Sequence, residues 1–372
     1  MFNILIALMG LEIGGAETHV VELAKGLKKE GFNVIVASNG GVYEKELLES
    51  GIKHYSVPLH NKKPHNVLRS YFLLKKIIVN ERIDLVHAHA RIPAFICNLL
   101  HNKMGFPFVT TAHWVFKTGW GLKYITPWGQ KTLAVSEDIK KYLMDNYGID
   151  EKNITVTING IDTEKFIPDL DVSDIVEEFD IDKKNKHIVY VSRLDSDRSK
   201  VAFQLLQIAP ELANELGDID IIIVGGGNVF DRLFERAQEV NRSIGRRLVI
   251  MTGGRTDINK FVSLSHVFIG VSRSALEAMS AEKPVILAGN EGYIGILDED
   301  KLRKAIHTNF TCRGETKSQE DKLKEDIIRV IRDMSAEEIR KMGIMSRKVI
   351  EERYSVKKMV SDNIKVYLQL LS

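Results

Sequence analysis

The sequence contains very little cysteine, with only Cys97 and Cys312 in 372 residues. The two are far apart in the chain, so neither a disulfide framework nor a cysteine-rich zinc site is predicted, and a reducing cytoplasm is the expected location. Long apolar stretches are also missing. The sequence contains no run of about 18 apolar residues, which is the length needed to span a membrane. Nor is one sign of charge in excess, because 52 basic and 50 acidic residues leave a formal net charge of +2. That balance argues against a nucleic-acid-binding protein that relies on overall charge.

The sequence also lacks a dinucleotide-binding fingerprint. Neither the glycines at 10, 14 and 15 nor those at 225–227 complete Gly-x-Gly-x-x-Gly, which disfavours a hydride-transfer enzyme. Gly14 and Gly15 do open a helical pattern directly after the first apolar run. Their backbone N–H groups can therefore approach an anion at the positive end of a helix dipole. Tight packing of strand against helix is the alternative interpretation.

What the sequence does contain is an alternation of short apolar runs with helical patterns, which predicts a doubly wound α/β fold. A length of 372 residues suits two domains. The polar, acidic stretch 169–186 separates two such series, and Ser335 with Glu338 predicts a helix start near the end of the chain. The predicted strands are 4–8, 34–37, 85–87, 108–111 and 132–135 in the first half and 187–192, 219–224, 248–252, 267–269 and 285–287 in the second.

The most informative segment is 272–295, which predicts a short helix carrying Glu277, a buried strand and a glycine-rich loop. At the ligand-binding edge of a parallel sheet, such a carboxylate can accept two hydrogen bonds from a ribose diol. The run Leu-Glu-Ala-Met-Ser-Ala-Glu-Lys-Pro-Val at 276–285 resembles the nucleotide-sugar signature of the retaining GT-B glycosyltransferases of family 4. Other motifs resemble that family in the same order: Gly-Gly-Ala-Glu at 14–17, Asp-Leu-Val-His-Ala-His at 84–89, Thr-Ala-His at 111–113, Val-Ser-Glu at 135–137, Asn-Gly-Ile-Asp at 159–162 and Ser-Arg-Leu at 192–194.

The resemblance implies a GT-B architecture, in which two Rossmann-like doubly wound domains face each other across a cleft. Residues 1–166 with 354–372 would form the N-terminal, acceptor-side domain. Residues 167–353 would form the C-terminal, nucleotide-sugar-binding domain. The last helix would cross back to the N-terminal domain.

The resemblance also implies the donor-binding residues. Gly14 and Gly15 would meet the diphosphate, and Glu277 would hold the ribose. Arg193 matches the family's first diphosphate-binding cation, and Arg198 replaces the second, with Lys200 as the alternative. Such a pair offsets charge that develops on the leaving diphosphate, so both arginines are also catalytic candidates.

One family carboxylate is missing, because the first Glu of the family's Glu-x7-Glu pattern falls at Ile269. We expect backbone N–H groups near Gly292 and Tyr293 to hold the donor sugar in its place. The side chains of Arg273 and Ser274 are further donor-binding candidates.

Histidines and tryptophans supply the remaining candidates. His113, in the Thr-x-His element, is implied to lie by the donor sugar and is the third catalytic candidate. His19, Trp114 and Trp120 are expected at the acceptor, although tryptophans are equally compatible with a core role. His87 and His89 are interpreted as structural. The spacing of the histidines gives no helical His-x3-His pair, so no metal site is predicted.

The function implied is retaining transfer of a hexose or N-acetylhexosamine from a nucleoside diphosphate sugar, most readily a UDP-sugar, to an acceptor hydroxyl. The acceptor would be a glycan, a lipid-linked molecule or a small molecule, in cell-envelope or surface glycan assembly. No cofactor, metal or nucleic acid is expected. A non-catalytic nucleotide-sugar-binding relative and a nucleotide-sugar epimerase of the same fold are the alternatives. The basic amphipathic segment from Lys62 to Lys76 fits either peripheral contact with the inner face of a membrane or a solvated helix face.

Overall fold

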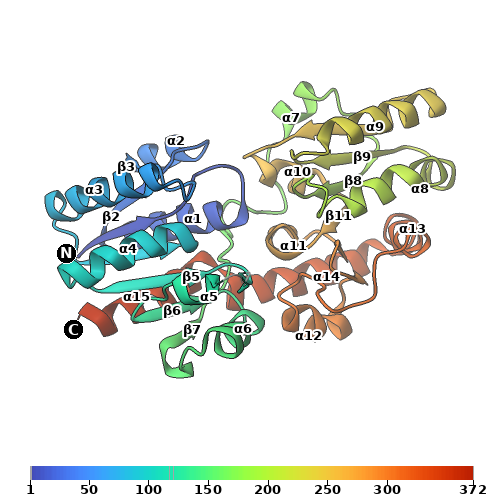
Figure 1. Cartoon of the computed structure of the whole chain (residues 1–372). Helices are drawn as coiled ribbons and strands as arrows, with labels where there is room; N and C mark the ends of the chain where they lie inside the picture. The colour runs from blue at the N-terminus through green and yellow to red at the C-terminus, as the bar shows by residue number, and fades with distance from the viewer. Residues whose placement is uncertain (1, 117, 120, 372) are drawn as a thin grey trace. The chain divides into compact units, whose positions relative to one another are not determined.

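The computed structural model describes residues 2–116, 118–119 and 121–371. The chain divides into two units, Met1–Gly160 with Tyr354–Ser372 and Ile161–Arg353. Each unit is built around its own sheet with helices on both faces (Figure 1). This is the α/β arrangement that the alternating pattern predicts.

The first unit contains a seven-stranded parallel sheet in the order β3-β2-β1-β4-β5-β6-β7. Its strands are β1 (Asn3–Ala7), β2 (Asn33–Ser38), β3 (Lys53–Ser56), β4 (Leu85–His89), β5 (Phe108–Ala112), β6 (Lys131–Ala134) and β7 (Ile154–Val156). Its helices are α1 (Gly15–Lys29), α2 (Glu44–Glu49), α3 (Pro64–Asn80), α4 (Arg91–Met104), α5 (Leu122–Ile125), α6 (Glu137–Tyr147) and α15 (Val356–Leu371), with a 3-10 turn at Glu151–Asn153.

Alternation along β1 shows how this sheet is covered. Ile4 and Ile6 face the core that contains α1 and α15, whereas Leu5 and Ala7 face the core that contains α3 and α4. Successive side chains of a strand point to opposite faces, so an unbroken apolar run is what a doubly covered strand requires. The last helix, α15, thus belongs to the first unit, as the GT-B architecture implies.

The second unit contains a six-stranded sheet in the order β10-β9-β8-β11-β12-β13, in which only β13 is antiparallel to its neighbour. The strands are β8 (Lys186–Val191), β9 (Ile219–Val224), β10 (Val249–Gly253), β11 (Val267–Gly270), β12 (Val285–Ala288) and β13 (Tyr293–Ile296). The helices are α7 (Ser173–Glu178), α8 (Lys200–Leu216), α9 (Phe230–Ile244), α10 (Ile258–Leu264), α11 (Ser272–Ser280), α12 (Glu299–His307), α13 (Glu320–Ile328) and α14 (Ala336–Val349), with π-helical turns at Arg329–Asp333 and Ile350–Tyr354. The predicted capping box of Ser335 and Glu338 starts α14 and is confirmed.

The chain enters the second unit at Ile161, rather than after residue 166 as the sequence had indicated. The carbonyl of Phe166 accepts hydrogen bonds from Ser280 (2.9 Å) and Arg347 (3.3 Å), both of which lie in the second unit. These contacts fix residues that the motif Asn-Gly-Ile-Asp had placed with the first domain.

Strand order reverses once in each sheet, and this locates the sites. β2 and β3 lie on one side of β1 while β4 lies on the other, and β9 and β10 lie on one side of β8 while β11 lies on the other. Ligands of open α/β sheets bind outside the carboxyl ends of the strands at such a reversal. The loops after β1 and β4, and those after β8 and β11, are therefore the expected binding positions.

Candidate active site

Four histidines gather at the carboxyl edge of the first sheet. His87 and His89 lie on β4, His113 follows β5, and His19 lies near the start of α1. His89 Nδ1 is 2.8 Å from His113 Nε2, and the ring centroids of His19 and His113 are 4.8 Å apart. The register of β4 on β5, in which His89 pairs with Thr111, brings the two histidine motifs together. His89 was interpreted as structural from the sequence. Its position at the end of a strand next to β5 is the signal that could have placed it among the candidate site residues.

Three of these histidines, His87, His89 and His113, are neutral at physiological pH. Burial lowers the pKa of His87 to about 3 and that of His113 to about 4, and it holds the pKa of His89 well below the ordinary value. His87 is also fixed at both ring nitrogens, by the Tyr367 hydroxyl (2.7 Å) and the Thr111 hydroxyl (2.6 Å). Both ring nitrogens thus have partners, which is what the structural role expected from the sequence requires, and one of these partners belongs to α15.

Three of the histidines also meet the geometric requirement of a cation site. One ring nitrogen from each of His19, His89 and His113 lies within 4.8 Å of the others. Neutral imidazoles are good ligands of first-row transition metals. The prediction that no metal binds rested on sequence spacing, which does not register ligands that come from three separate elements.

The two predicted glycines do lie at the start of α1. Gly14 precedes the helix in an extended conformation, and Gly15 is its first residue. A Cβ on Gly14 would come within 2.2 Å of the Glu17 carboxylate, whereas one on Gly15 would meet no atom within 4 Å. The helix terminus thus already carries a carboxylate, and an incoming diphosphate would have to displace it.

Arg193 lies just beyond β8, at the reversal of the second sheet. Its guanidinium donates to the Asp195 carboxylate through Nε (3.1 Å) and Nη2 (2.7 Å). The backbone N–H of Asn228, together with Arg193, holds the pKa of Asp195 below its ordinary value. About half of the Arg193 side chain is exposed, so the guanidinium can exchange this partner for a ligand.

Arg198 and Lys200 differ in where their charges lie. The Arg198 side chain is 46% exposed, with Asp197 at 3.9 Å. The Lys200 ammonium instead donates to the Ser318 carbonyl at 2.8 Å. This difference favours Arg198 over Lys200 as the second cation.

Arg273 and Glu277 form a buried ion pair on α11, next to the same reversal. Arg273 Nε donates to Glu277 Oε1 at 2.9 Å, and the two side chains are 10% and 7% exposed. The spacing i, i+4 places both on one helix face. The Ser274 hydroxyl donates to the carbonyl of Val191 (3.3 Å) at the end of β8 and to that of Val271 (3.1 Å), which caps α11, and so ties α11 to β8.

Ile269 lies in the middle of the sheet. It is fully buried on β11, where it pairs with Tyr190 of β8 and Ile286 of β12. Only Val271 separates β11 from α11, so the chain has no loop there that could carry a carboxylate. The missing acid therefore reflects a short strand-to-helix connection, and no apolar side chain has replaced it in a ligand site.

The glycine-rich loop predicted after 285–287 is a β-hairpin turn, closed by a hydrogen bond from Gly289 N to Gly292 O (3.0 Å). The Tyr293 side chain is only 8% exposed, and its hydroxyl donates to Asp326 at 2.6 Å. That side chain belongs to the core and does not reach a ligand. A Cβ on Gly292 would lie 2.0 Å from the Cys312 carbonyl oxygen, so close packing is a sufficient reason for this glycine.

The tryptophans differ in how far they are exposed. Trp114 is 42% exposed, as an acceptor-binding residue requires. Trp128 is partly buried against Phe116 and Tyr147, with ring centroids at 5.8 and 5.1 Å. Trp120 lies outside the described residues.

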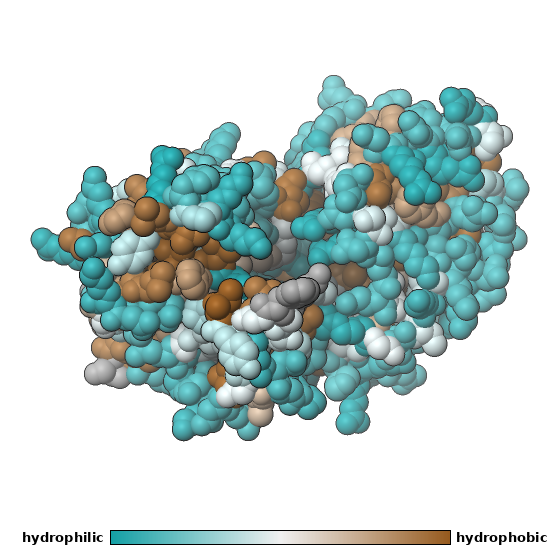
Figure 2. All heavy atoms as spheres, viewed as in Figure 1, coloured by the Kyte–Doolittle hydropathy of each residue, from teal (hydrophilic) through white to brown (hydrophobic). Residues whose placement is uncertain are grey.

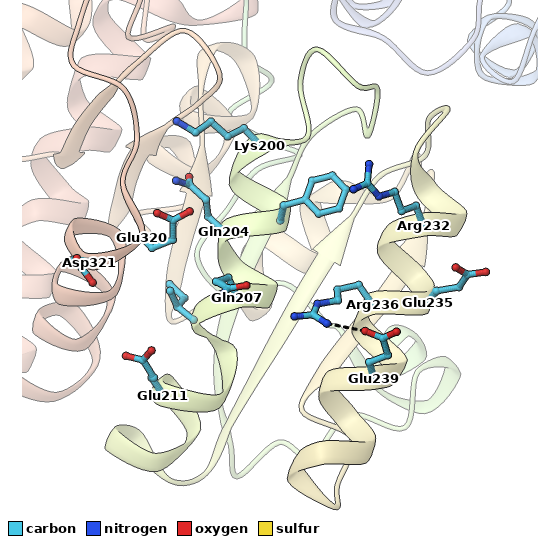
Figure 3. A pocket seen from close by; sticks show the side chains of 12 residues that line it. Lys200, Gln204, Gln207, Glu211, Arg232, Glu235, Arg236, Glu239, Glu320 and Asp321 are labelled. Carbon is cyan, nitrogen blue, oxygen red and sulfur yellow. Dashed lines mark hydrogen bonds and ion pairs between the residues drawn. The ribbon is translucent and has the colours of Figure 1, made fainter.

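A separate hollow of about 820 Å³ lies in the second unit, between side chains of 12 residues (Figure 3). Side chains of α8, α9 and α13 line it, with Arg232 over the Phe203 ring at 5.0 Å and Arg236 paired with Glu239 at 2.7 Å. Of the residues considered for the donor site, Lys200, the alternative second cation, lines this hollow, whereas Arg193, Arg198, Arg273 and Glu277 do not.

Comparison with known proteins agrees with this geometry. A model of Glycosyltransferase Family 4 matches residues 13–165, and a model of Glycosyl transferases group 1 matches residues 171–349. The chain belongs to the family 4 glycosyltransferases. This transferase is 24% identical over 282 residues to the Escherichia coli UDP-Gal:alpha-D-GlcNAc-diphosphoundecaprenol alpha-1,3-galactosyltransferase, a match that covers 70% of the chain and 72% of that protein.

Solved structures resemble the transferase over its whole length. A Rickettsia africae glycosyltransferase is 23% identical and has a TM-score of 0.80, with 100% of this chain and 99% of that chain covered. HepE of Anabaena, in complex with UDP-glucose, is 16% identical and has a TM-score of 0.76, with both chains fully covered. These likenesses confirm the predicted two-domain, Rossmann-like GT-B fold.

Proposed function

We propose that this transferase moves a hexose or N-acetylhexosamine from a UDP-sugar to a hydroxyl of a lipid-linked or glycan acceptor, with retention at the anomeric carbon. The observation that carries the proposal is that Arg193 follows β8 while the Arg273–Glu277 pair follows its neighbour β11, at the reversal of one sheet. Cations for a diphosphate and a carboxylate for a ribose are thus provided side by side. HepE binds UDP-glucose, and the name of the E. coli relative gives a UDP-Gal donor and a diphosphoundecaprenol-linked acceptor, which supports this choice.

In this proposal Glu277 accepts hydrogen bonds from the ribose, and Arg273, which donates to its carboxylate, holds that carboxylate in place. Arg193 and Arg198 offset the negative charge that grows on the diphosphate as its bond to the anomeric carbon breaks. The acceptor oxygen attacks the same face of the sugar, and the departing phosphate takes its proton. A neutral His113 donates to a sugar hydroxyl, while His19 and Trp114 hold the acceptor.

Two alternatives make different predictions. An epimerase of the same fold would alter the nucleotide sugar without any acceptor, whereas a transferase forms product only when an acceptor is added. A non-catalytic relative would bind the nucleotide sugar but would never cleave the bond between its nucleotide and its sugar. Ile269 is fully buried and does not take the place of the missing carboxylate, so turnover with an acceptor is what separates this second alternative from a transferase.

Thermal stabilisation by UDP, GDP, ADP, CDP and dTDP and their sugars tests the donor site. A ligand at 100 times its dissociation constant adds about 2.7 kcal/mol of stability. We expect a shift with UDP compounds that disappears in Arg193→Ala and Arg198→Ala and persists in Arg236→Ala, a control that removes an equally exposed arginine from an ion pair elsewhere.

The UDP-sugar that stabilises the protein is then tested as a donor. It is incubated with a lipid-diphosphate-linked acceptor and with protein from which a chelator has removed metal ions. Transfer with retained configuration, read by NMR of the product, would support the proposal and its metal independence. Stabilisation by a different nucleotide, or UDP binding that survives both site variants, would refute the donor assignment.

A further inference from the structure

One segment of the first unit is strongly basic, although the formal net charge of the whole chain is only +2. Residues 50–136 contain twelve of the 52 lysines and arginines but only two of the 50 acidic residues, Glu81 and Asp84. Both acids have partners within the unit, because Glu81 pairs with Lys53 at 3.0 Å and Asp84 accepts from Asn3 N at 2.7 Å. The rest of the chain is consequently net acidic, and positive charge is concentrated in this segment.

The helices α3 and α4 present that segment to solvent. Neither helix contains an acidic residue. Lys62 and Lys63 precede α3, and Arg69, Lys75 and Lys76 lie on it. Since α3 also buries Leu74, Ile77 and Ile78 in the core, its orientation on the sheet is fixed.

Large apolar side chains lie on the outward side of the same two helices. On α3, Leu68, Phe72 and Val79 are 59%, 58% and 58% exposed at helical spacing, and on α4, Phe95 and Leu99 are 37% and 42% exposed. The two helices pack against each other, so these five residues form one surface, which we call the α3–α4 face. Figure 2 shows apolar side chains gathered over these helices.

The same segment continues this character beyond α4. Trp114, Tyr124 and Ile125 are 42%, 88% and 55% exposed. Residues 50–136 thus hold eight of the fourteen large apolar side chains exposed in the described part of the chain. Such a concentration on a soluble domain marks an interaction site.

The chemistry of the α3–α4 face favours a lipid surface. Phe, Leu and Val can enter the boundary between headgroups and acyl chains, while lysine and arginine beside them bind anionic headgroups. A nucleic acid would use the cations and leave the aliphatic side chains without a function. In the described residues no helix is both long and apolar enough to cross a bilayer, so contact of this kind would be made from one side.

We propose that the α3–α4 face docks this transferase on the surface of an anionic bilayer, with Leu68 and Phe72 as apolar anchors and the basic residues of 62–76 as headgroup ligands. The inference deepens the proposed function and rests on it, because a lipid-linked acceptor would be reached at that surface. The sequence had indicated only a basic amphipathic segment; the structure adds the apolar anchors and the second helix.

Cosedimentation of the full chain with vesicles at low salt tests the docking. We expect binding to phosphatidylcholine vesicles that contain 30% phosphatidylglycerol, and at least tenfold weaker binding to pure phosphatidylcholine. Leu68→Ser with Phe72→Ser should weaken binding at least tenfold, as should Lys75→Glu with Lys76→Glu. The matched controls are Phe234→Ser with Ile344→Ser, which are 41% and 47% exposed in the second unit, and Lys341→Glu with Lys348→Glu, and both should bind like the unaltered protein.

Three results would overturn the proposal. One is no binding to anionic vesicles, and another is binding that the apolar variant leaves unchanged. The third is a dimer in light scattering that dissociates in Leu68→Ser with Phe72→Ser, because the face would then be an interface between copies of the chain. Turnover of a soluble acceptor analogue separates this inference from the proposed function: loss of docking leaves such turnover intact, whereas failure of the function abolishes turnover with docking retained.

Discussion

Glu277 combines two properties that single residues seldom share, a motif position that implies ligand binding and a buried ion pair. Its carboxylate accepts from Arg273 Nε at 2.9 Å, and both side chains are at least nine-tenths buried. Removing one member of a buried pair costs about 3–5 kcal/mol, because the other charge stays behind without compensation. Stability and the ribose binding that we propose would therefore be coupled at this residue.

We expect Glu277→Ala to lower the free energy of unfolding by about 3–5 kcal/mol even without a nucleotide. Glu277→Gln, which keeps an acceptor oxygen for Arg273, should lose less. Urea unfolding of both variants measures the difference. An unchanged urea midpoint for Glu277→Ala would show that the pair contributes nothing to the fold. Nucleotide affinity is accordingly best measured in Glu277→Gln.

At this scale the sequence predicts where a residue lies on the sheet better than what its side chain contacts. Gly14, Arg193 and Glu277 follow predicted strands, and a strand end in a parallel sheet locates a residue at the ligand edge without further information. For Tyr293 only a backbone N–H was expected at the donor, and its side chain, whose hydroxyl donates to Asp326 on α13, carried no prediction. Local pattern carries no signal for a partner 33 residues away.

Among the elements, the edge formed by β4 and β5 has the clearest electrostatic consequence. Burial lowers the folded-state pKa of His87 to about 3 and that of His113 to about 4, from an ordinary value of 6.5. Below pH 6.5 these histidines bind protons in the unfolded chain but stay neutral in the folded unit until the pH approaches their lowered pKa values. The stability present above pH 6.5 is therefore lost progressively as the pH falls towards 4.

We expect the urea midpoint of the first unit to fall steadily between pH 7 and pH 5. Each of these histidines contributes a slope of up to about 1.4 kcal/mol per pH unit. His113→Gln should reduce this slope by up to about 1.4 kcal/mol per pH unit, because glutamine does not titrate. A midpoint that rises on acidification would show that the histidines are charged in the folded state.

Element prediction succeeded where the period was unbroken and failed at short connections. The strands β8 and β9 are apolar over 188–191 and 221–224, as strands covered on both faces require. β12 was predicted as a strand, whereas β13 was predicted as part of a glycine-rich loop, since its four residues Tyr-Ile-Gly-Ile give no period. The contact of α15 with α1 depends on Gly26, where a Cβ would come within 2.3 Å of Val360, and spacing alone cannot reveal such a pairing.

For the whole molecule, the division into two units predicts how it unfolds. The second unit has its own apolar core around β8 and α8, and the first has separate cores on the two faces of its sheet. A chain built in this way need not unfold in one step. The last helix complicates the order along the chain, because α15 returns to the first unit after the second is complete.

Differential scanning calorimetry should resolve two transitions that respond to different changes. Tyr367→Phe removes the hydroxyl bound to His87 and should lower only the first-unit transition, by about 1–3 kcal/mol. Gly292→Ala forces a Cβ to 2.0 Å from the Cys312 carbonyl and should lower only the second-unit transition, by a similar amount. UDP should raise most strongly the transition that Gly292→Ala lowers, because Glu277, Arg193 and Arg198, which we propose hold the ribose and the diphosphate, lie in the second unit. If all three changes moved a single transition together, the two units would be one cooperative body, and the donor site could not be assigned to either unit from stability alone.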